Sequence, residues 1–70
     1  MQRQRVASRA LREVGYDPPT HTLEVTFASG TVYRYFDVPE FLSRGLTVAK
    51  SKGTYFAKRI NGRFRFEQVK

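Results

Sequence analysis

The chain has 70 residues, with 13 Lys and Arg against six Asp and Glu, which gives a net charge of +7. A chain of this length supports one small domain, and the lack of cysteine excludes disulfides and thiolate-bound metals. No apolar run is long enough for a transmembrane helix and no secretory leader is visible, so we expect a cytoplasmic protein.

The basic residues gather at the two ends of the sequence. Residues 1–12 hold four Arg and no acid, and residues 50–70 hold seven bases and one acid, while the middle is mildly acidic. If both ends lie together in the fold, they form one positive face, which favours a polyanion or an acidic protein surface. The alternative is that these charges only keep a small aromatic-rich domain soluble.

The first half of the chain predicts three antiparallel strands. They are expected at residues 11–16, 22–27 and 31–36, with turns at 17–20 and 28–30. Two prolines in the first turn cannot donate ladder hydrogen bonds, and Gly30 allows a positive φ in the second. Leu11 and Val14 are out of phase with strict alternation, which predicts a bulge or a short helical lead-in in the first strand.

The second half predicts two short helices and a final strand. The first helix begins near Pro39, and its shared face is predicted to hold Phe41, Leu42, Leu46 and Ala49. Ser51 is the predicted N-cap of the second helix, and Asn61-Gly62 ends it. In the last strand, Phe64 and Phe66 alternate with basic residues. The predicted class is α+β, a three-stranded antiparallel meander followed by two short helices and a final strand (β-β-β-α-α-β).

Four segments of the chain form a recognisable pattern. They are Val14–Asp17, Leu23–Phe27, Gly30–Pro39 and Ser51–Phe56. The most specific marks are Tyr33-x-Tyr35, the Val-Pro pair after it, and Ser-Lys-Gly before an aromatic pair. This pattern resembles the KTSC domain, which is found at the C-terminus of some lysyl-tRNA synthetases, as small stand-alone bacterial proteins and in phage genomes. The resemblance covers residues 6–69 and implies RNA binding, but no aminoacylation.

The start of the second helix is a candidate anion site. It comprises Lys50, Ser51, Lys52 and Gly53. The first amides of a helix have no intrahelical partner and carry partial positive charge, so a phosphate is stabilised there between two ammonium groups. The alternative is a plain N-cap beside two solvated lysines.

Further basic residues are candidates for phosphate contact. They are Lys58, Arg59, Arg63 and Arg65 near the C-terminus, and Arg34 in the third strand. Arg63 and Arg65 are expected on the outward face of the last strand, where basic side chains suit a phosphate backbone. Such residues also protect an edge strand against aggregation, which is the other explanation.

The tyrosine pair admits two interpretations. Tyr33 and Tyr35 lie two apart on one strand face, so exposed rings at that spacing are able to stack successive unpaired bases. In the other interpretation they pack beneath the helices. The second is favoured, because facing them outward would bury Arg34.

The N-terminal residues are expected to form a basic, flexible arm over 1–8, followed by a single KTSC-like domain over 9–70. Such an arm would be ordered only on a partner, and its contacts would come from Arg3, Arg5, Arg9 and Arg12.

Catalysis finds little support in the sequence. His21 is the only histidine, and the sequence offers no convincing Ser, His and Asp set for nucleophilic catalysis. We therefore expect no enzyme activity, no cofactor and no metal site.

Two functions remain open at this point. The first is a monomeric binding module for RNA or single-stranded nucleic acid. The second is a regulator, of cellular or phage origin, that docks on an acidic surface of the transcription or translation machinery. Membrane binding is not expected, because the helices are short and lack a basic amphipathic face of useful length.

Overall fold

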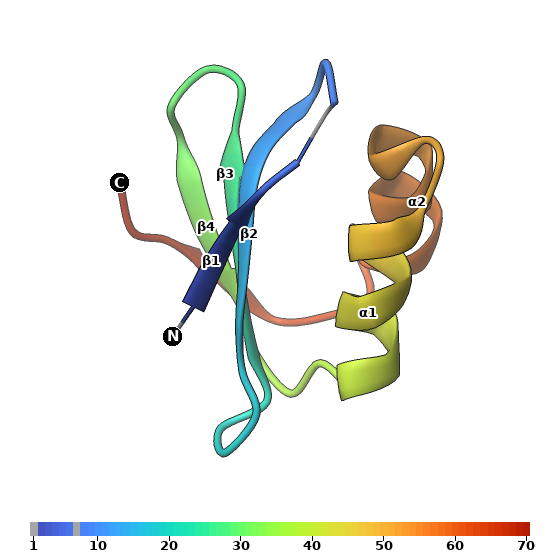
Figure 1. The fold of residues 1–70 in the computed structure, drawn as a ribbon. Coiled ribbons are helices and arrows are strands. Elements are labelled where there is room, and N and C mark those ends of the chain that lie inside the picture. Colours follow the sequence, from blue (N-terminus) through green and yellow to red (C-terminus); the bar gives the residue numbers. More distant parts are fainter. Residues whose placement is uncertain (1, 7) are drawn as a thin grey trace.

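Five antiparallel strands form one sheet, and two helices cover one of its faces (Figure 1). The computed structural model describes residues 2–6 and 8–70. The strands are β1 (Gln2–Arg5), β2 (Leu11–Asp17), β3 (Thr22–Phe27), β4 (Val32–Tyr35) and β5 (Phe66–Gln68), and the helices are α1 (Glu40–Val48) and α2 (Lys52–Arg59). The strands lie in chain order, so β5 returns beside β4 after the helices. The predicted α+β class is confirmed, with β2 to β5 and the helices in the expected order.

The chain begins with a strand where the sequence predicted an arm. β1 pairs with β2 in antiparallel register, from Gln2 opposite Tyr16 to Arg5 opposite Glu13. Its sequence, Gln-Arg-Gln-Arg, has no alternating apolar residues, so hydrophobic periodicity gives no strand signal. Pairing along the edge of β2 instead satisfies backbone groups that an open edge leaves to water. Met1 and Ala7, which belong to the predicted arm, lie outside the described residues.

The predicted irregularity in β2 is a β-bulge. The register with β3 shifts between Leu11 and Glu13. Because the bulge adds one residue, Leu11 and Val14 both face the helices despite their odd spacing, and both are buried.

The core lies between the sheet and the helices, around Phe56 of α2. The Phe56 ring makes T-shaped contacts with Phe27, at 5.4 Å between centroids, and with Tyr35, at 5.5 Å. The other fully packed members are Leu11, Val14, Leu23, Val25, Val38, Leu46 and Ile60. Edge-to-face aromatic pairs of this kind contribute about 0.5–1.5 kcal/mol beyond their buried area, which matters in so small a core.

The second face of the sheet carries no helix and is lined by charged residues. Arg3, Glu24, Arg34 and Glu67 face this side, which we call the open sheet face. Glu24 is only 3% exposed and forms ion pairs with Arg3 and Arg34. Because Glu24 gives Arg34 a partner on this face, the tyrosines of β4 are free to point toward the helices.

Two local features differ from the sequence prediction. Phe41 does not share the buried face of α1 but is 70% exposed, because Leu42 and Leu46, four residues apart, already occupy that face. The final strand begins only at Phe66, which is 55% exposed. The residues before it form a turn, in which Gly62 has a φ of +78°. Arg63 and Arg65 therefore do not line a strand face.

Candidate nucleic-acid interface

The start of α2 faces the turn between β1 and β2. Between them lies a groove of about 490 Å³, here called the α2 N-terminal groove. It is lined by Ser8, Arg9, Ala10, Lys50, Ser51, Lys52 and Gly53. A Cβ on Gly53 would lie 3.4 Å from the Cβ of Ala10, so the helix and the turn approach closely. This approach brings Arg9, from the N-terminal basic block, beside the lysines of the C-terminal block.

Two predicted residues of this groove have structural partners. Ser51 is the N-cap of α2, as predicted, and its Oγ accepts a hydrogen bond from the Thr54 amide at 3.4 Å. Lys52 is half-buried, and its Nζ donates to the carbonyl oxygen of Ala49 at 2.7 Å, which ties the end of α1 to the start of α2. Lys50 and Arg9 are exposed and supply the mobile charges of the groove.

A second groove lies at the other end of α2, beside the start of α1. This α2 C-terminal groove has a volume of about 810 Å³. It is lined by Phe41, Leu42, Ala57, Lys58, Arg59, Arg63 and Phe64. Arg63 Nε donates to the carbonyl oxygen of Lys58 at 2.9 Å, which places its guanidinium at the helix end, where positive charge complements the helix dipole.

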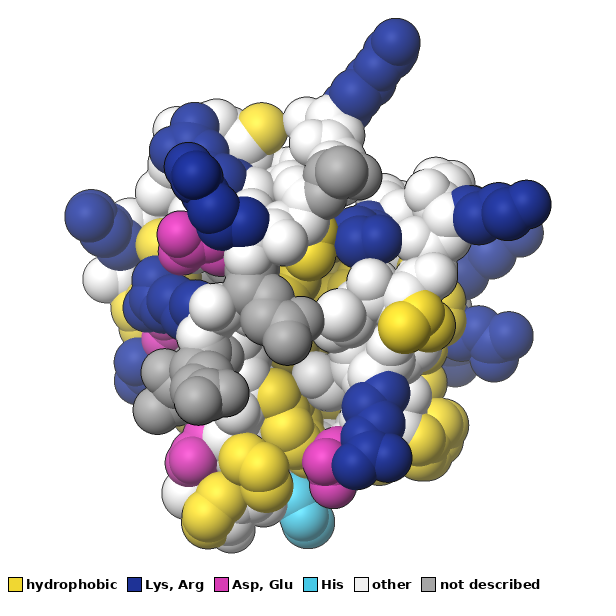
Figure 2. Space-filling view, in the orientation of Figure 1, with side chains coloured by type: hydrophobic (Ala, Val, Ile, Leu, Met, Phe, Trp, Pro, Cys, Tyr) yellow, Lys and Arg dark blue, Asp and Glu magenta, His cyan; other side chains and the backbone are white. Residues whose placement is uncertain are grey.

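The two grooves lie at opposite ends of α2, and both are lined by basic residues. We call the two together the α2 basic surface, and its charged members are Arg9, Lys50, Lys52, Lys58, Arg59 and Arg63. None of the described residues that line either groove is acidic. In Figure 2 Lys and Arg side chains appear around much of the outline, whereas Asp and Glu appear on the left and at the bottom, so that only basic side chains are visible among the charged ones at the top and upper right. Five of the seven bases of residues 50–70 therefore lie on this surface.

The remaining N-terminal arginines lie elsewhere, so the single positive face predicted from both chain ends is only partly formed. Arg3 pairs with Glu24 and Glu13 on the open sheet face. Arg12 lines the same side and donates to the carbonyl oxygen of Ala28 at 2.9 Å. Arg5 is placed there by its register opposite Glu13. Here carboxylates lie between the bases.

Two more predicted phosphate contacts have structural roles instead. Arg34 directs Nε and Nη2 to one oxygen of Glu24, at 3.3 and 2.9 Å. Arg65 lies over the ring of Phe36, 5.2 Å from its centroid. Both guanidiniums are held by intramolecular partners, and neither lies on the α2 basic surface.

The tyrosine pair is part of the core, as the favoured interpretation held. Tyr35 is 4% exposed. Tyr33 is half-buried in T-shaped contacts with Phe27 and Phe66, at 5.6 Å in each case. Burial, with a smaller contribution from neighbouring Tyr33, raises the pKa of Tyr35 to about 12. The alternative, in which these rings stack bases, is not favoured by this arrangement, because Tyr35 is buried and Tyr33 half-buried.

Comparison with known families matches this geometry to one of them. A profile described as the KTSC domain matches residues 7–64, which is most of the chain. The chain belongs to the KTSC domain family. The resemblance read from the sequence is therefore confirmed.

Relatives of this KTSC domain occur in two settings. It is 44% identical over 59 residues to the lysine–tRNA ligase of Nostoc punctiforme, a match of 84% of the chain and only 10% of the ligase. It is 45% identical to a protein of Stutzerimonas stutzeri, over 80% of this chain and 79% of that one. The crystal structure of a KTSC domain protein from Yersinia pestis superposes with a TM-score of 0.95 at 36% identity, over 99% of this chain and 97% of the other.

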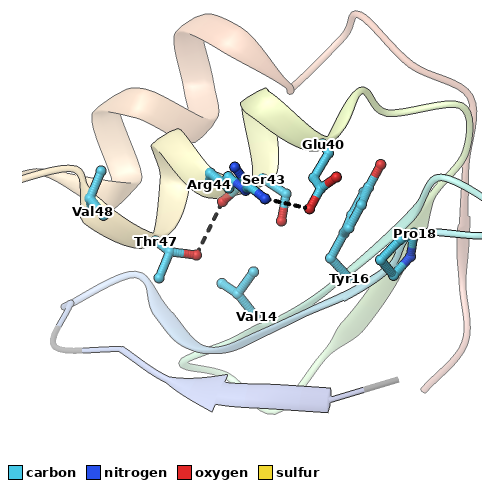
Figure 3. A pocket seen from close by; sticks show the side chains of 8 residues that line it. All are labelled: Val14, Tyr16, Pro18, Glu40, Ser43, Arg44, Thr47 and Val48. Atoms are coloured by element: carbon cyan, nitrogen blue, oxygen red, sulfur yellow. Dashed lines mark hydrogen bonds and ion pairs between the residues drawn. The ribbon is translucent and has the colours of Figure 1, made fainter.

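A third hollow of this KTSC domain lies between α1 and β2 (Figure 3). Val14 and Tyr16 of the strand face Glu40, Ser43, Arg44 and Thr47 of the helix. Its one carboxylate, Glu40, pairs with Arg44 at 3.1 Å, and the Thr47 hydroxyl donates to the Ser43 carbonyl. Among the described lining residues there is no imidazole.

Two further features are absent from the described part of the chain. No cluster of three or more His, Asp or Glu side chains is placed to hold a metal ion within residues 2–6 and 8–70. Neither helix of the described chain has the length and apolar character needed to cross a bilayer.

One residue of the interface was missed by the sequence analysis. Phe41 was assigned to the core, but it opens onto the α2 C-terminal groove beside three bases. The sequence did hold a signal for this exposure. Leu42 and Leu46 already fill the buried stripe of so short a helix, and Phe41, one residue before Leu42, points about 100° away from Leu42.

Proposed function

We propose that this KTSC domain is a non-enzymatic module that binds RNA through the α2 basic surface. The observation that carries the proposal is the gathering of six Lys and Arg at two grooves whose described lining residues include no acid. Positive charge of this kind attracts phosphate and raises the rate of encounter with a polyanion. With RNA as the partner, the expected compartment is the cytoplasm.

The dimensions of α2 suit a short run of nucleotides. Eight residues give a helix about 12 Å long, which corresponds to three or four nucleotides of a stacked strand at about 3.4 Å each. Lys50, Lys58 and Arg59 are exposed, so they can turn toward phosphates without giving up an ion pair. On the open sheet face, by contrast, Arg3 and Arg34 would have to leave the nearly buried Glu24.

The identity of the relatives favours RNA over DNA. Three similar proteins are lysine–tRNA ligases, enzymes named for a tRNA substrate, and the matched region is 10% of each. A similar domain is thus part of enzymes named for a tRNA substrate, which supports an RNA-binding role for this domain.

The proposal is tested by the salt dependence of RNA affinity, measured by fluorescence anisotropy with a labelled single-stranded RNA. On single strands log K falls with log[salt] by about 0.7 per phosphate neutralised. If all six Lys and Arg side chains of the α2 basic surface contact phosphates, the slope reaches up to about −4. The double variant Lys58→Ala/Arg59→Ala is expected to reduce this slope by about 1.4 in magnitude.

The matched control removes two charges from the open sheet face, in Arg5→Ala/Lys70→Ala. This variant is expected to keep the full slope, because neither residue lies on the α2 basic surface. Absence of binding at about 50 mM salt, or equal losses in both double variants, would contradict the proposal.

The second function, docking on an acidic protein surface, would use the same charges. The unmodified domain and the Lys58→Ala/Arg59→Ala variant also distinguish this function from RNA binding. Retention of one host polypeptide on the immobilised domain after nuclease treatment, together with RNA affinity unaffected by Lys58→Ala/Arg59→Ala, would favour that alternative. An RNA-binding module is instead expected to lose its host partners when nuclease is added.

A further inference from the structure

The α2 C-terminal groove combines an exposed aromatic ring with positive charge. Phe41 is 70% exposed, more than Phe66 at 55%, the other large aromatic side chain that the structure leaves exposed among the described residues. Leu42, Ala57 and Phe64 form an apolar floor beside it. Lys58, Arg59 and Arg63 line the same groove. An apolar surface rimmed by one sign of charge indicates a ligand with both an apolar face and negative charge.

We propose that this groove binds an unpaired nucleobase, stacked on Phe41, with the adjoining phosphates held by Lys58, Arg59 and Arg63. The proposal rests on the proposed function and specifies its ligand as single-stranded rather than duplex RNA. Every base has a flat π-face that stacks on an aromatic ring, and a basic groove follows the backbone beside it. In a duplex the base faces are covered by their neighbours, so Phe41 has nothing to contact there.

The groove also fits the geometry of a strand lying along α2. The two grooves lie at opposite ends of α2, so a strand held at Lys50 and at Lys58 would have Phe41 beside its second contact. Phe41 comes from α1, and the three basic side chains, Lys58, Arg59 and Arg63, come from α2 and the turn after it. Only the folded pairing of the two helices brings the ring and the charges together.

An acidic peptide with an apolar side chain is the competing occupant. It satisfies the charge of the groove, but an aliphatic side chain of the peptide gains no more from the Phe41 ring than from an aliphatic side chain of similar size. The nucleobase is favoured because stacking requires the aromatic face that Phe41 presents. The difference between Phe41→Leu and Phe41→Trp therefore separates the two occupants.

The test compares RNA ligands by fluorescence anisotropy at one low salt concentration. They are a single strand, a blunt duplex of the same length, and the same strand with abasic positions. Phe41→Leu is expected to weaken single-strand binding about 5- to 100-fold and to leave duplex binding unchanged. Val48→Leu is the matched control, since Val48 is also exposed, at 80%, on the same helix. It is expected to change neither affinity.

The chain has no Trp, so Phe41→Trp supplies a single fluorescent reporter at the site. Its emission is expected to be quenched by the single strand and not by the abasic strand, while Val48→Trp shows no quenching by either. Circular dichroism of each variant confirms that it is folded.

The outcomes separate the inference from the function on which it rests. Unchanged single-strand affinity in Phe41→Leu, with RNA binding intact, overturns the stacking site and leaves the binding module standing. Failure of the unmodified domain to bind any RNA overturns both. Tight binding of a Glu-rich, Leu-containing peptide that Phe41→Leu does not weaken, with no quenching by RNA, assigns the groove to an acidic peptide and also overturns the inference.

Discussion

Tyr35 shows how strongly this small core acts on a single side chain. Its ring lies between Phe56 and Phe66, with centroids 5.5 and 5.7 Å away. Burial is the main reason that the pKa of Tyr35 rises to about 12, and the nearby Tyr33 adds to it. The phenol therefore keeps its proton in the folded chain at pH values where the unfolded chain has lost it.

This shift predicts alkaline destabilisation. With an ordinary tyrosine pKa near 10 in the unfolded chain, the contribution of Tyr35 is complete below about pH 10 and is lost as the pH rises toward 12. The free energy of unfolding is expected to fall by at most about 1.4 kcal/mol per pH unit in this window. Urea unfolding from pH 9 to pH 11.5 measures it.

Tyr35→Phe is the control, since it keeps the ring and removes the titrating hydroxyl. Other groups titrate equally in both proteins, so the difference between the two pH profiles isolates Tyr35. Parallel profiles in the two proteins would show that this phenol does not have a raised pKa.

The placement of Tyr35 was only half predictable from the sequence. Alternation in the strand put the two tyrosines on one face and Arg34 on the other. The sequence did not reveal that Glu24, ten residues earlier, lies directly opposite Arg34 and pairs with it. Cross-strand partners depend on register, which is a property of the folded sheet rather than of either strand alone.

At the scale of elements, the contact between α1 and α2 depends on a glycine. A Cβ on Gly45 would lie 2.1 Å from Oη and 2.7 Å from Cζ of Tyr55, closer than atoms can approach. The sequence indicated only that Gly45 weakens a helix. Its packing role was not predictable, because the residue that fills the space above it belongs to the next helix.

Gly45→Ala is therefore expected to destabilise the domain by about 1–2 kcal/mol, despite the better helix propensity of alanine. In a Tyr55→Ala background the same change is expected to stabilise by about 0.5–1 kcal/mol, because the clash is gone and only propensity remains. Urea unfolding of the four proteins gives both values.

The reversal of sign is the informative result of this cycle. A Gly45→Ala effect that is the same with and without the Tyr55 ring would show that the two helices do not pack as described. β1 and Phe41 illustrate the same limit of prediction, since each is placed by neighbouring elements and not by its own local pattern.

At the scale of the whole molecule, the charges are sorted between two faces. The α2 basic surface gathers six bases, whereas the open sheet face mixes basic side chains with Glu13, Glu24 and Glu67. Net charge and its concentration at the chain ends were readable from the sequence. The sorting was not, because it depends on which turn meets which helix, as the placement of Arg9 beside Lys50 shows.

RNA is proposed to contact the α2 side of the domain and not the open sheet face. The most direct test is an NMR titration of the isotope-labelled domain with a short single-stranded RNA, following every backbone amide. We expect shifts that cluster in residues 50–54 and 57–64 and near Arg9, with little change in the central part of β3. Shifts centred on Glu24 and Arg34, or no shifts at low salt, would contradict it.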